Sequence, residues 1–267
     1  MRSLIQSRYN ILTMFLALDI GNSNISLGVF QDDELQHTWR IATEPDRLPD
    51  EYDVLLRSLL SLKGITADTI QGIAICSVVP QLTPVFETVS NNVFETKPLV
   101  VGTGTRTGVR VLCDNPREVG TDRIVDTAAA HHLYGGPIVI VDFGTATVFD
   151  AVNSSGEYLG GAITPGINMA ADALYRKTAQ LRRVELTAPS SAIGRNTVTA
   201  LQSGLVYGHV EMVEGMVNRF QKELGPDTKV VATGGNAPLI AQHTKVFSHV
   251  NLALTLVGLK LIHAIND

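Results

Sequence analysis

Two segments of the chain place an aspartate, a glycine and a polar side chain directly after an apolar run. Asp142 is followed by Phe-Gly-Thr and Asp19 by Ile-Gly-Asn, with strand-forming residues on either side of both segments. A strand that turns there would hold one carboxylate and several backbone N–H groups at its tip. The N–H groups can bind phosphate, whereas a carboxylate beside phosphate must act through a cation. A plainer interpretation is that both aspartates cap turns, which is common for this residue.

The two segments belong to an internal repeat. Asp142 follows Asp19, and Gly144 follows Gly21, at the same spacing of 123 residues. Further pairs match at that spacing, namely Thr145 with Asn22, Val152 with Val29 and Glu157 with Glu34. A repeat of this length predicts a duplicated half-molecule. We expect its two tips to face each other across a cleft.

A third candidate, Gly120-Thr121-Asp122-Arg123, lies near the start of a predicted helix. The helix dipole would keep Asp122 ionised, as a proton acceptor must be. The planar guanidinium of Arg123 could hold a substrate carboxylate. The alternative is an ordinary Asp–Arg pair on a helix surface, which contributes little.

Two further glycine-rich turns, at 160–166 and 232–236, could let a nucleotide approach the backbone or could be plain connections. No helix follows the glycine of either aspartate segment, so the pattern is not a dinucleotide-binding or P-loop signature. We therefore expect phosphate contacts from turn N–H groups and from the hydroxyls of Ser23, Ser26 and Thr145.

Hydrophobic periodicity and turn residues predict similar sets of elements in the two halves. In the first half we expect strands at 15–21, 26–31, 35–43, 72–79 and 98–101, and helices at 51–62 and 82–93. In the second half we expect strands at 138–143, 145–152, 157–164 and 229–233, and helices at 167–177, 197–224 and 252–265. One more helix begins with the capping pattern at Asn115–Glu118, or nearer Asp122, and ends before Gly135.

The composition is that of a folded, acidic protein. The 267 residues suffice for one large domain or two smaller ones. Hydrophobic residues make up 45% and charged residues 18%, which is typical of soluble proteins. The net charge of -5, without clustered Lys and Arg, argues against nucleic acid as a partner. Cys76 and Cys113 lack a paired spacing, which fits a reducing, cytoplasmic environment.

The N-terminal apolar run at 11–20 superficially resembles a signal peptide. Asp19 interrupts it and no small-residue cleavage site follows, so we reject that interpretation. No segment reaches the roughly 18 apolar residues of a membrane span, so we expect no membrane association.

The repeat and the turns suggest three segments. We expect residues 1–13 to be a disordered extension, 14–115 to form an N-terminal domain and 116–267 a C-terminal domain. The last helix of the second domain could pack back on the first.

Taken together and in order, these segments resemble the motif set of type III pantothenate kinases. The resemblance runs from about residue 15 to 236 and rests on 19–24, 76–80, 115–123, 142–147, 160–166, 193–197, 202–204 and 233–235. That family belongs to the superfamily of acetate and sugar kinases, heat-shock ATPases and actin. The resemblance implies an α/β fold of two duplicated ribonuclease-H-like (actin-like ATPase) domains, each a mixed five-stranded sheet flanked by helices. The repeat agrees with this fold.

The resemblance also implies a reaction, which is the ATP-dependent phosphorylation of the primary hydroxyl of pantothenate to 4'-phosphopantothenate, the first step of coenzyme A biosynthesis. ATP would be bound by Thr145 and by the first tip, which comprises Asp19, Ile20, Gly21, Asn22, Ser23, Asn24, Ile25 and Ser26. Mg²⁺ would accompany ATP, and Asp142 would hold the K⁺ or NH₄⁺ that the family requires.

Pantothenate would be bound by Gly120, Thr121, Asp122 and Arg123, with Asp122 as the catalytic base, and by Thr197. Thr121 stands where the family usually has alanine. Cys113 occupies a substrate-binding position where the family usually has a tyrosine that contacts pantothenate. The family is usually homodimeric, and the helix at 197–224, with Gly204 and Gly208, is a reasonable contact surface.

Two alternatives stay open. A kinase of the same superfamily could act on another small alcohol such as a sugar, although the block at 115–123 speaks against this. A non-catalytic regulatory or accessory homologue is hinted at only by Cys113. Retention of Asp19, Asp122, Asp142 and Thr145 speaks against it.

Overall fold

The computed structural model describes residues 13–267, which form two compact units that divide between Gly102 and Thr103. This division falls earlier than the expected boundary at 115/116, because the segment from 106 onward is attached to the second unit. The backbone N–H of Tyr158 donates to the carbonyl of Arg110 at 2.9 Å, and that of Leu112 donates to the carbonyl of Tyr158 at 2.8 Å. The predicted extension at 1–13 lies, except for Thr13, outside the described residues.

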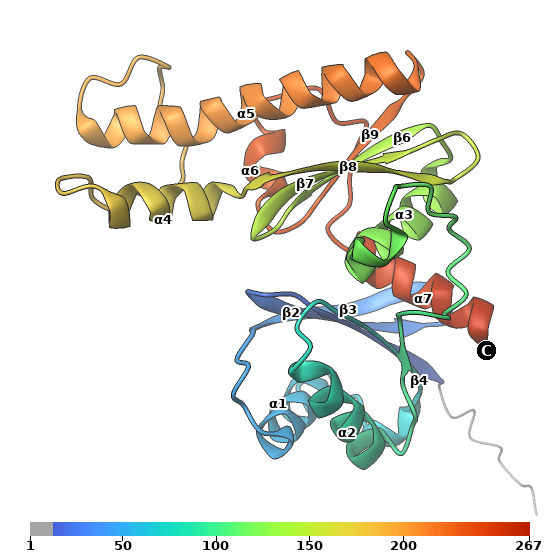
Figure 1. Ribbon diagram of the computed structural model, residues 1–267. Coiled ribbons are helices and arrows are strands. Elements are labelled where there is room, and N and C mark those ends of the chain that lie inside the picture. Colours follow the sequence, from blue (N-terminus) through green and yellow to red (C-terminus); the bar gives the residue numbers. More distant parts are fainter. Residues whose placement is uncertain (1–12) are drawn as a thin grey trace, which may run out of the picture. The chain divides into compact units, whose positions relative to one another are not determined.

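The first unit is a five-stranded mixed sheet with two long helices. Its strand order is β3-β2-β1-β4-β5, with β1 and β4 parallel and the β1–β2–β3 meander antiparallel. Both helices pack on one face of the sheet (Figure 1), where the alternate β1 residues Leu16, Leu18 and Ile20 join one core cluster with Tyr52 and Phe86. The elements are β1 (Met14–Ile20), β2 (Asn24–Gln31), β3 (Glu34–Ala42), α1 (Pro49–Ser61), η1 (Ala67–Thr69), β4 (Ile70–Ser77), α2 (Leu82–Phe94) and β5 (Leu99–Val100).

The second unit repeats this plan. Its strand order is β10-β9-β6-β7-β8, again with an antiparallel meander beside parallel strands. The elements are η2 (Pro116–Glu118), α3 (Thr121–Tyr134), β6 (Ile138–Phe143), β7 (Ala146–Val152), β8 (Tyr158–Pro165), α4 (Ile167–Lys177), α5 (Thr197–Leu224), β9 (Lys229–Thr233), α6 (Ala237–Ala241), β10 (His249–Val250) and α7 (Leu254–Asn266). The predicted fold class, two duplicated α/β domains with mixed five-stranded sheets, is confirmed.

Both faces of the second sheet are covered. Figure 1 shows α5 and α6 on one face and α3 and α7 on the other. Alternation along β6 explains this, because Val139 and Val141 join the core cluster of α5 and α6, whereas Ile138 and Ile140 join that of α3 and α7. Strand β6 is therefore apolar on both sides, and its first polar side chain is Asp142 near its end.

The repeat holds in three dimensions with one difference. Asp19 pairs with Ser26 across the first hairpin, and Asp142 pairs with Val148 across the second. The first turn, between Ile20 and Asn24, is thus one residue longer than the second, so the spacing of 123 shifts by one after the turn. Val152 and Val29 therefore match in sequence but not in the structure. Val152 is paired with Ile138, whereas Val29 is paired with Leu16, and these two partners are not 123 residues apart.

The helix expected from Asn115 is split. Residues 116–118 form a separate 3₁₀ turn, and α3 begins at Thr121 after Gly120, as the second of the two expected starts suggested. Asn115 does bond Glu118, through its Nδ2 at 2.5 Å, so the capping pattern closes a single turn only.

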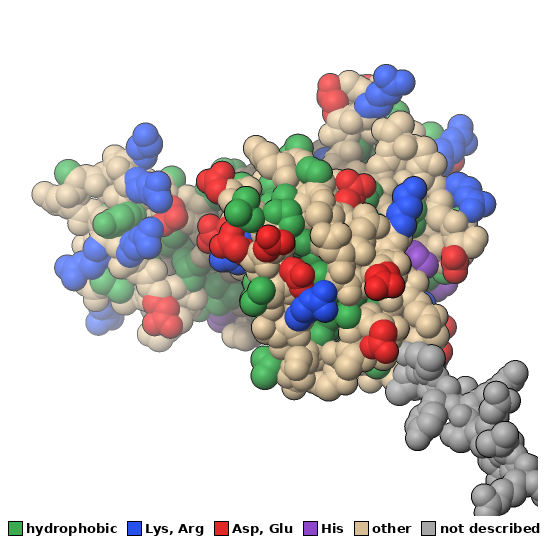
Figure 2. All heavy atoms as spheres, turned by 90° about the horizontal axis from the view of Figure 1, so that it is seen from below, with side chains coloured by type: hydrophobic (Ala, Val, Ile, Leu, Met, Phe, Trp, Pro, Cys, Tyr) green, Lys and Arg blue, Asp and Glu red, His purple; other side chains and the backbone are tan. Residues whose placement is uncertain are grey.

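The surface is mixed in charge. On the face drawn in Figure 2, Asp and Glu side chains lie among the Lys and Arg side chains. None of the helices within residues 13–267 is both long and apolar enough to cross a membrane.

Candidate active site

One face of the second sheet gathers acidic side chains at the start of α3. Asp142 shares the face of Ile138 and Ile140, and Asp150 of β7 is paired directly with Ile140, so both carboxylates lie on the side that α3 covers. Arg123, in the first turn of α3, bonds Asp150 there. The structure therefore brings three predicted residues, Asp122, Arg123 and Asp142, to one region.

Asp122 lies in the first turn of α3, where its carboxylate accepts a hydrogen bond from the backbone N–H of Arg123 at 2.9 Å. The expected ionising effect of the helix start is present but is outweighed. Burial raises the pKa of Asp122, and the hydrogen bond and charge of Arg123 lower it only in part. Gly120 gives this carboxylate its space, because a Cβ added at Gly120 would collide with Oδ1 of Asp122.

Arg123 is fixed by a buried partner. Its Nε and Nη2 both bond Oδ1 of Asp150, at 2.8 and 2.6 Å, and the Asp150 side chain is only 2% exposed. Burial lowers the pKa of Arg123, but the hydrogen bond and charge of Asp150 outweigh it and raise that pKa overall. The alternative interpretation, an ordinary Asp–Arg pair on the helix surface, is thus wrong, because the partner of Arg123 is a buried aspartate from another element.

Asp142 is the most perturbed carboxyl group of the region. Burial, followed by the negative charges of Asp122 and Asp150, raises the pKa of Asp142 to about 7. Burial likewise raises the pKa of Asp150 to about 6, although Arg123 opposes this. The charge of Arg123 lowers the pKa of Asp122 and Asp150, whereas, within residues 13–267, Asp142 has only the negative charges of those two residues near it, so the region favours an added positive charge.

The donors present fit an oxygen-binding cation. Asp142 offers a carboxylate, the ligand type that hard cations prefer. Within residues 13–267, no three His, Cys, Asp or Glu side chains are arranged to hold a metal ion. A cation at Asp142 would take its other ligands from backbone carbonyls, water or nucleotide.

The second tip is built from three segments. Its turn carries the exposed Thr145, whose carbonyl accepts a hydrogen bond from Gly166 at 3.2 Å. A Cβ at Gly166 would collide with that carbonyl, and one at Gly234 would collide with Oδ1 of Asp142. The glycine-rich turns near 160–166 and 232–236 therefore pack against the tip, whatever else they contact.

The first tip lies in the other unit and is more open. Asn22, Ser23 and Asn24 are exposed. The turn is closed by the N–H of Gly21, which donates to the carbonyl of Asn24 at 3.0 Å, and by the Thr43 hydroxyl, which donates to the carbonyl of Gly21 at 2.6 Å.

Two predicted substrate residues have different positions relative to this region. Cys113 lies beside it, close enough for its thiol to affect the phenol of Tyr158. Thr197 does not join it. Thr197 is the exposed first residue of α5, and Figure 1 shows that end of α5 well away from α3.

Sequence reasoning missed Asp150 and Tyr158, and it singled out Gly161 only as part of the turn at 160–166. Tyr158 is 1% exposed, and hydrogen bonding by its side chain lowers the pKa of Asp150 in part. A Cβ at Gly161 would lie 2.7 Å from Nη2 of Arg123 and 3.0 Å from Oδ1 of Asp150. The one available signal was Asp150 itself, a charged residue within a strand of apolar residues.

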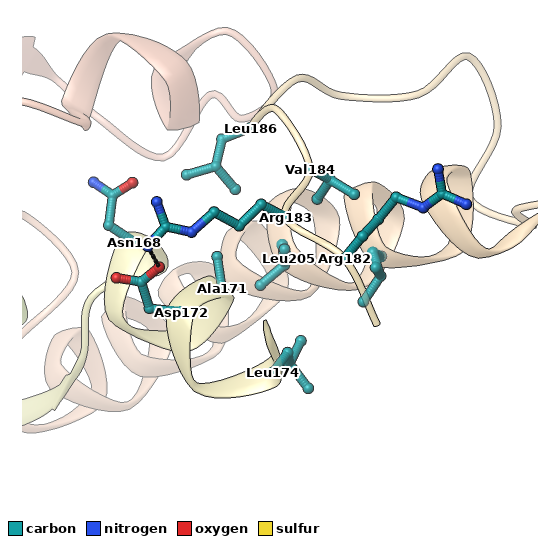
Figure 3. A pocket seen from close by; sticks show the side chains of 10 residues that line it. Asn168, Ala171, Asp172, Leu174, Arg182, Arg183, Val184, Leu186 and Leu205 are labelled. Atoms are coloured by element: carbon teal, nitrogen blue, oxygen red, sulfur yellow. Dashed lines mark ion pairs between the residues drawn. The ribbon is translucent and has the colours of Figure 1, made fainter. Parts of the chain in front are cut away.

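A separate hollow of about 370 Å³ lies between α4, the segment after it and α5. Figure 3 shows Arg183 pointing along it to Asp172, with which it forms an ion pair at 3.1 Å, and Leu186 and Leu205 are among the residues that line it. It contains none of the predicted site residues.

The amino-acid sequence matches one known protein family over most of its length. The model of the family described as type III pantothenate kinase matches residues 15–219. A type III pantothenate kinase from Roseiflexus sp. (strain RS-1) is 51% identical over 253 residues, which cover 95% of this chain and 99% of that protein.

Solved structures of other proteins have a fold similar to that of this chain. The ethanolamine utilization protein EutJ from Carboxydothermus hydrogenoformans has a TM-score of 0.57 at 14% identity, over 93% of this chain and 89% of that one. An inorganic polyphosphate/ATP-glucomannokinase from Arthrobacter sp. strain KM has a TM-score of 0.52 at 12% identity, over 96% of this chain and 100% of that one. At such identities the likeness concerns the fold alone.

Proposed function

The chain belongs to the type III pantothenate kinase family and phosphorylates pantothenate, and we propose that Asp122 is the general base of this reaction. The observation that carries the proposal is the setting of Asp122. Its carboxylate lies in the first turn of α3, next to Arg123, and burial raises its pKa toward the range in which a carboxylate accepts protons effectively.

The proposed step is a phosphoryl transfer. Asp122 takes the proton of the primary hydroxyl as that oxygen bonds to the γ-phosphorus of ATP, and the bond from the γ-phosphorus to the bridging oxygen breaks to release ADP. Such reactions depend mostly on positioning and on stabilising the charge of the transferring group. Protonation of Asp122 at low pH removes the base, so activity falls as the medium becomes acidic.

Arg123 binds the carboxylate of pantothenate in this proposal. Its guanidinium is fixed by Asp150, and a planar, fixed fork suits a carboxylate. Gly120 and Thr121 also contact pantothenate in this proposal. Cys113 follows Leu112, whose backbone N–H donates to the carbonyl of Tyr158 at 2.8 Å.

ATP is held by the first tip, from Asp19 to Ser26, and by Thr145. The exposed, polar residues 22–24 and the backbone N–H groups of the turn support this assignment. Mg²⁺ bound with ATP, and K⁺ or NH₄⁺ at Asp142, would supply the positive charge that offsets the phosphates. The raised pKa of Asp142 supports a cation there, because a bound cation would keep the carboxylate ionised.

We also propose a cytoplasmic homodimer. Gly204, Gly208 and Gly215 on α5 are exposed, and a Cβ added at any of them would meet nothing within 4 Å in this chain. This surface leaves room for the α5 helix of a second copy. Since Thr197 lies away from α3, a contact between Thr197 and pantothenate would come from that second copy. The dimer is tested by the sedimentation coefficient of a Gly208→Leu variant.

The decisive experiment measures phosphopantothenate formed by the full chain with ATP, Mg²⁺, K⁺ and pantothenate. Asp122→Asn should lower kcat by about 10² to 10⁴. The matched control is Asp53→Asn, which alters a surface pair with Arg57 on α1 and should leave kcat unchanged. Full activity of Asp122→Asn contradicts the base, and ATP binding without turnover on any alcohol would favour the accessory homologue.

A further inference from the structure

We infer that Tyr158 and Asp150 are positioning residues that hold the Arg123 guanidinium in place for the carboxylate of the substrate. The inference rests on the proposed role of Arg123 in binding pantothenate. It assigns to the same site two buried residues outside the motifs of the sequence.

The contacts form a chain from a phenol to a guanidinium. Asp150 accepts hydrogen bonds from Nε and Nη2 of Arg123 at 2.8 and 2.6 Å. The Tyr158 side chain is the next group in line, and its hydrogen-bonding effect lowers the pKa of Asp150. The guanidinium carbon also stands 5.5 Å from the centre of the Tyr158 ring. An arginine held through two of its three guanidinium nitrogens has little freedom to turn, and the third, Nη1, remains to bind a ligand.

An irregularity in β8 places Tyr158 in this chain of contacts. Asp150 is paired with Gly161 and Val152 with Tyr158, so β8 has one extra residue between these two pairs. Gly160, at a φ of 130°, absorbs the extra length. Without this bulge, Tyr158 and Gly161 would point to opposite faces, because strand side chains alternate. With it, both lie on the face of Asp150.

Gly161 and the backbone of Tyr158 help to fix these residues in place. Gly161 leaves the space that Nη2 of Arg123 and Oδ1 of Asp150 occupy. The backbone of Tyr158 is bonded through both its N–H and its carbonyl to the segment at 110–112 that leads to Cys113. The fixed guanidinium is therefore built by α3, β7, β8 and this segment together.

A purely structural ion pair is the rival explanation, since a buried carboxylate needs a partner in any case. The two explanations predict different effects of a variant on substrates with and without a carboxylate. Positioning of Arg123 matters only for a substrate that carries a carboxylate. Loss of a structural pair harms all substrates alike.

The test compares pantothenate with pantothenol, in which an alcohol replaces the carboxylate, using the full chain. Tyr158→Phe keeps the ring and removes the hydroxyl. It should raise the KM for pantothenate on the order of fivefold, while kcat and the KM for ATP stay within about twofold. The KM for pantothenol should not change. Tyr134→Phe is the matched control, because it removes a hydroxyl bonded by Asn251 at 3.1 Å elsewhere in the same unit.

Asp150→Asn is the second variant and should raise the KM for pantothenate on the order of 100-fold, again without a matching rise for pantothenol. An equal rise for both substrates, or a fall in kcat alone, in both variants overturns the inference. The Arg123→Gln variant separates it from the proposed function. If Arg123→Gln raises only the KM for pantothenate while the Tyr158 and Asp150 variants do not, the inference about Tyr158 and Asp150 is wrong and the proposed role of Arg123 stands. If Arg123→Gln has no effect, the role of Arg123 itself is wrong.

Discussion

The strand tips of the two duplicated units differ in the length of their turns and in what packs against them. The first turn, between β1 and β2, is one residue longer and exposes Asn22, Ser23 and Asn24. The second, between β6 and β7, is tighter, and Gly166 and Gly234 pack against it. An open polar turn suits phosphate oxygens, whereas a covered carboxylate suits a cation.

The strands behind the tips diverge as well. Asp150 is paired with Ile140, and at the equivalent rung of the first unit Gly28 is paired with Ala17. The first unit thus lacks a carboxylate where the second has one. The two units share their strand order and differ in where they place charge.

The largest expected effect concerns the covering of the second tip. Gly234→Ala should lower the free energy of unfolding by about 3 kcal/mol, because the φ of Gly234 is 84° and an added Cβ would collide with Asp142 and Phe143. Gly21→Ala is the matched variant in the first unit. Its Cβ would lie 3.1 Å from the carbonyl oxygen of Asn24, so the loss should be about 1 kcal/mol. Urea unfolding measures both, and equal losses would remove the difference between the tips.

The next effect concerns the cation. Asp142→Asn should abolish the response of kcat to K⁺ and lower kcat by about 10- to 100-fold, because the amide cannot balance a cation as a carboxylate does. Asp19→Asn should mainly raise the KM for ATP and keep the response to K⁺. Titration of kcat with K⁺ in both variants checks this assignment. A K⁺ response that survives in Asp142→Asn and vanishes in Asp19→Asn would exchange the two roles.

The smallest effect is the pH dependence of stability. The pKa of Asp142 rises from 3.8 to about 7 on folding, so between these values the folded state binds the proton more tightly than the unfolded state. The free energy of unfolding therefore falls as pH rises from about 4 to 7, by about 1 to 2 kcal/mol after allowance for solvent. Asp142→Asn should flatten this part of the profile, measured without K⁺. An unchanged slope would show that Asp142 does not titrate differently in the folded state.

Regular elements with strong local patterns were predictable. The ends of α4, α5 and β9 agree with the predicted ranges, since glycine, proline and Asn196 mark where these elements begin or end. The short α6 and the two-residue β10 were missed. Elements this short carry too little periodicity to stand out from the turns around them.

The sequence by itself determined the duplication, the family and the residues that lie in motifs, because apolar periodicity and motif order are local properties of the chain. Only the tertiary structure decided the partner of Arg123, the raised pKa of Asp142 and the separation of Thr197 from α3. These depend on strand register, on one bulge in β8 and on burial. Contacts between residues distant in sequence set all three.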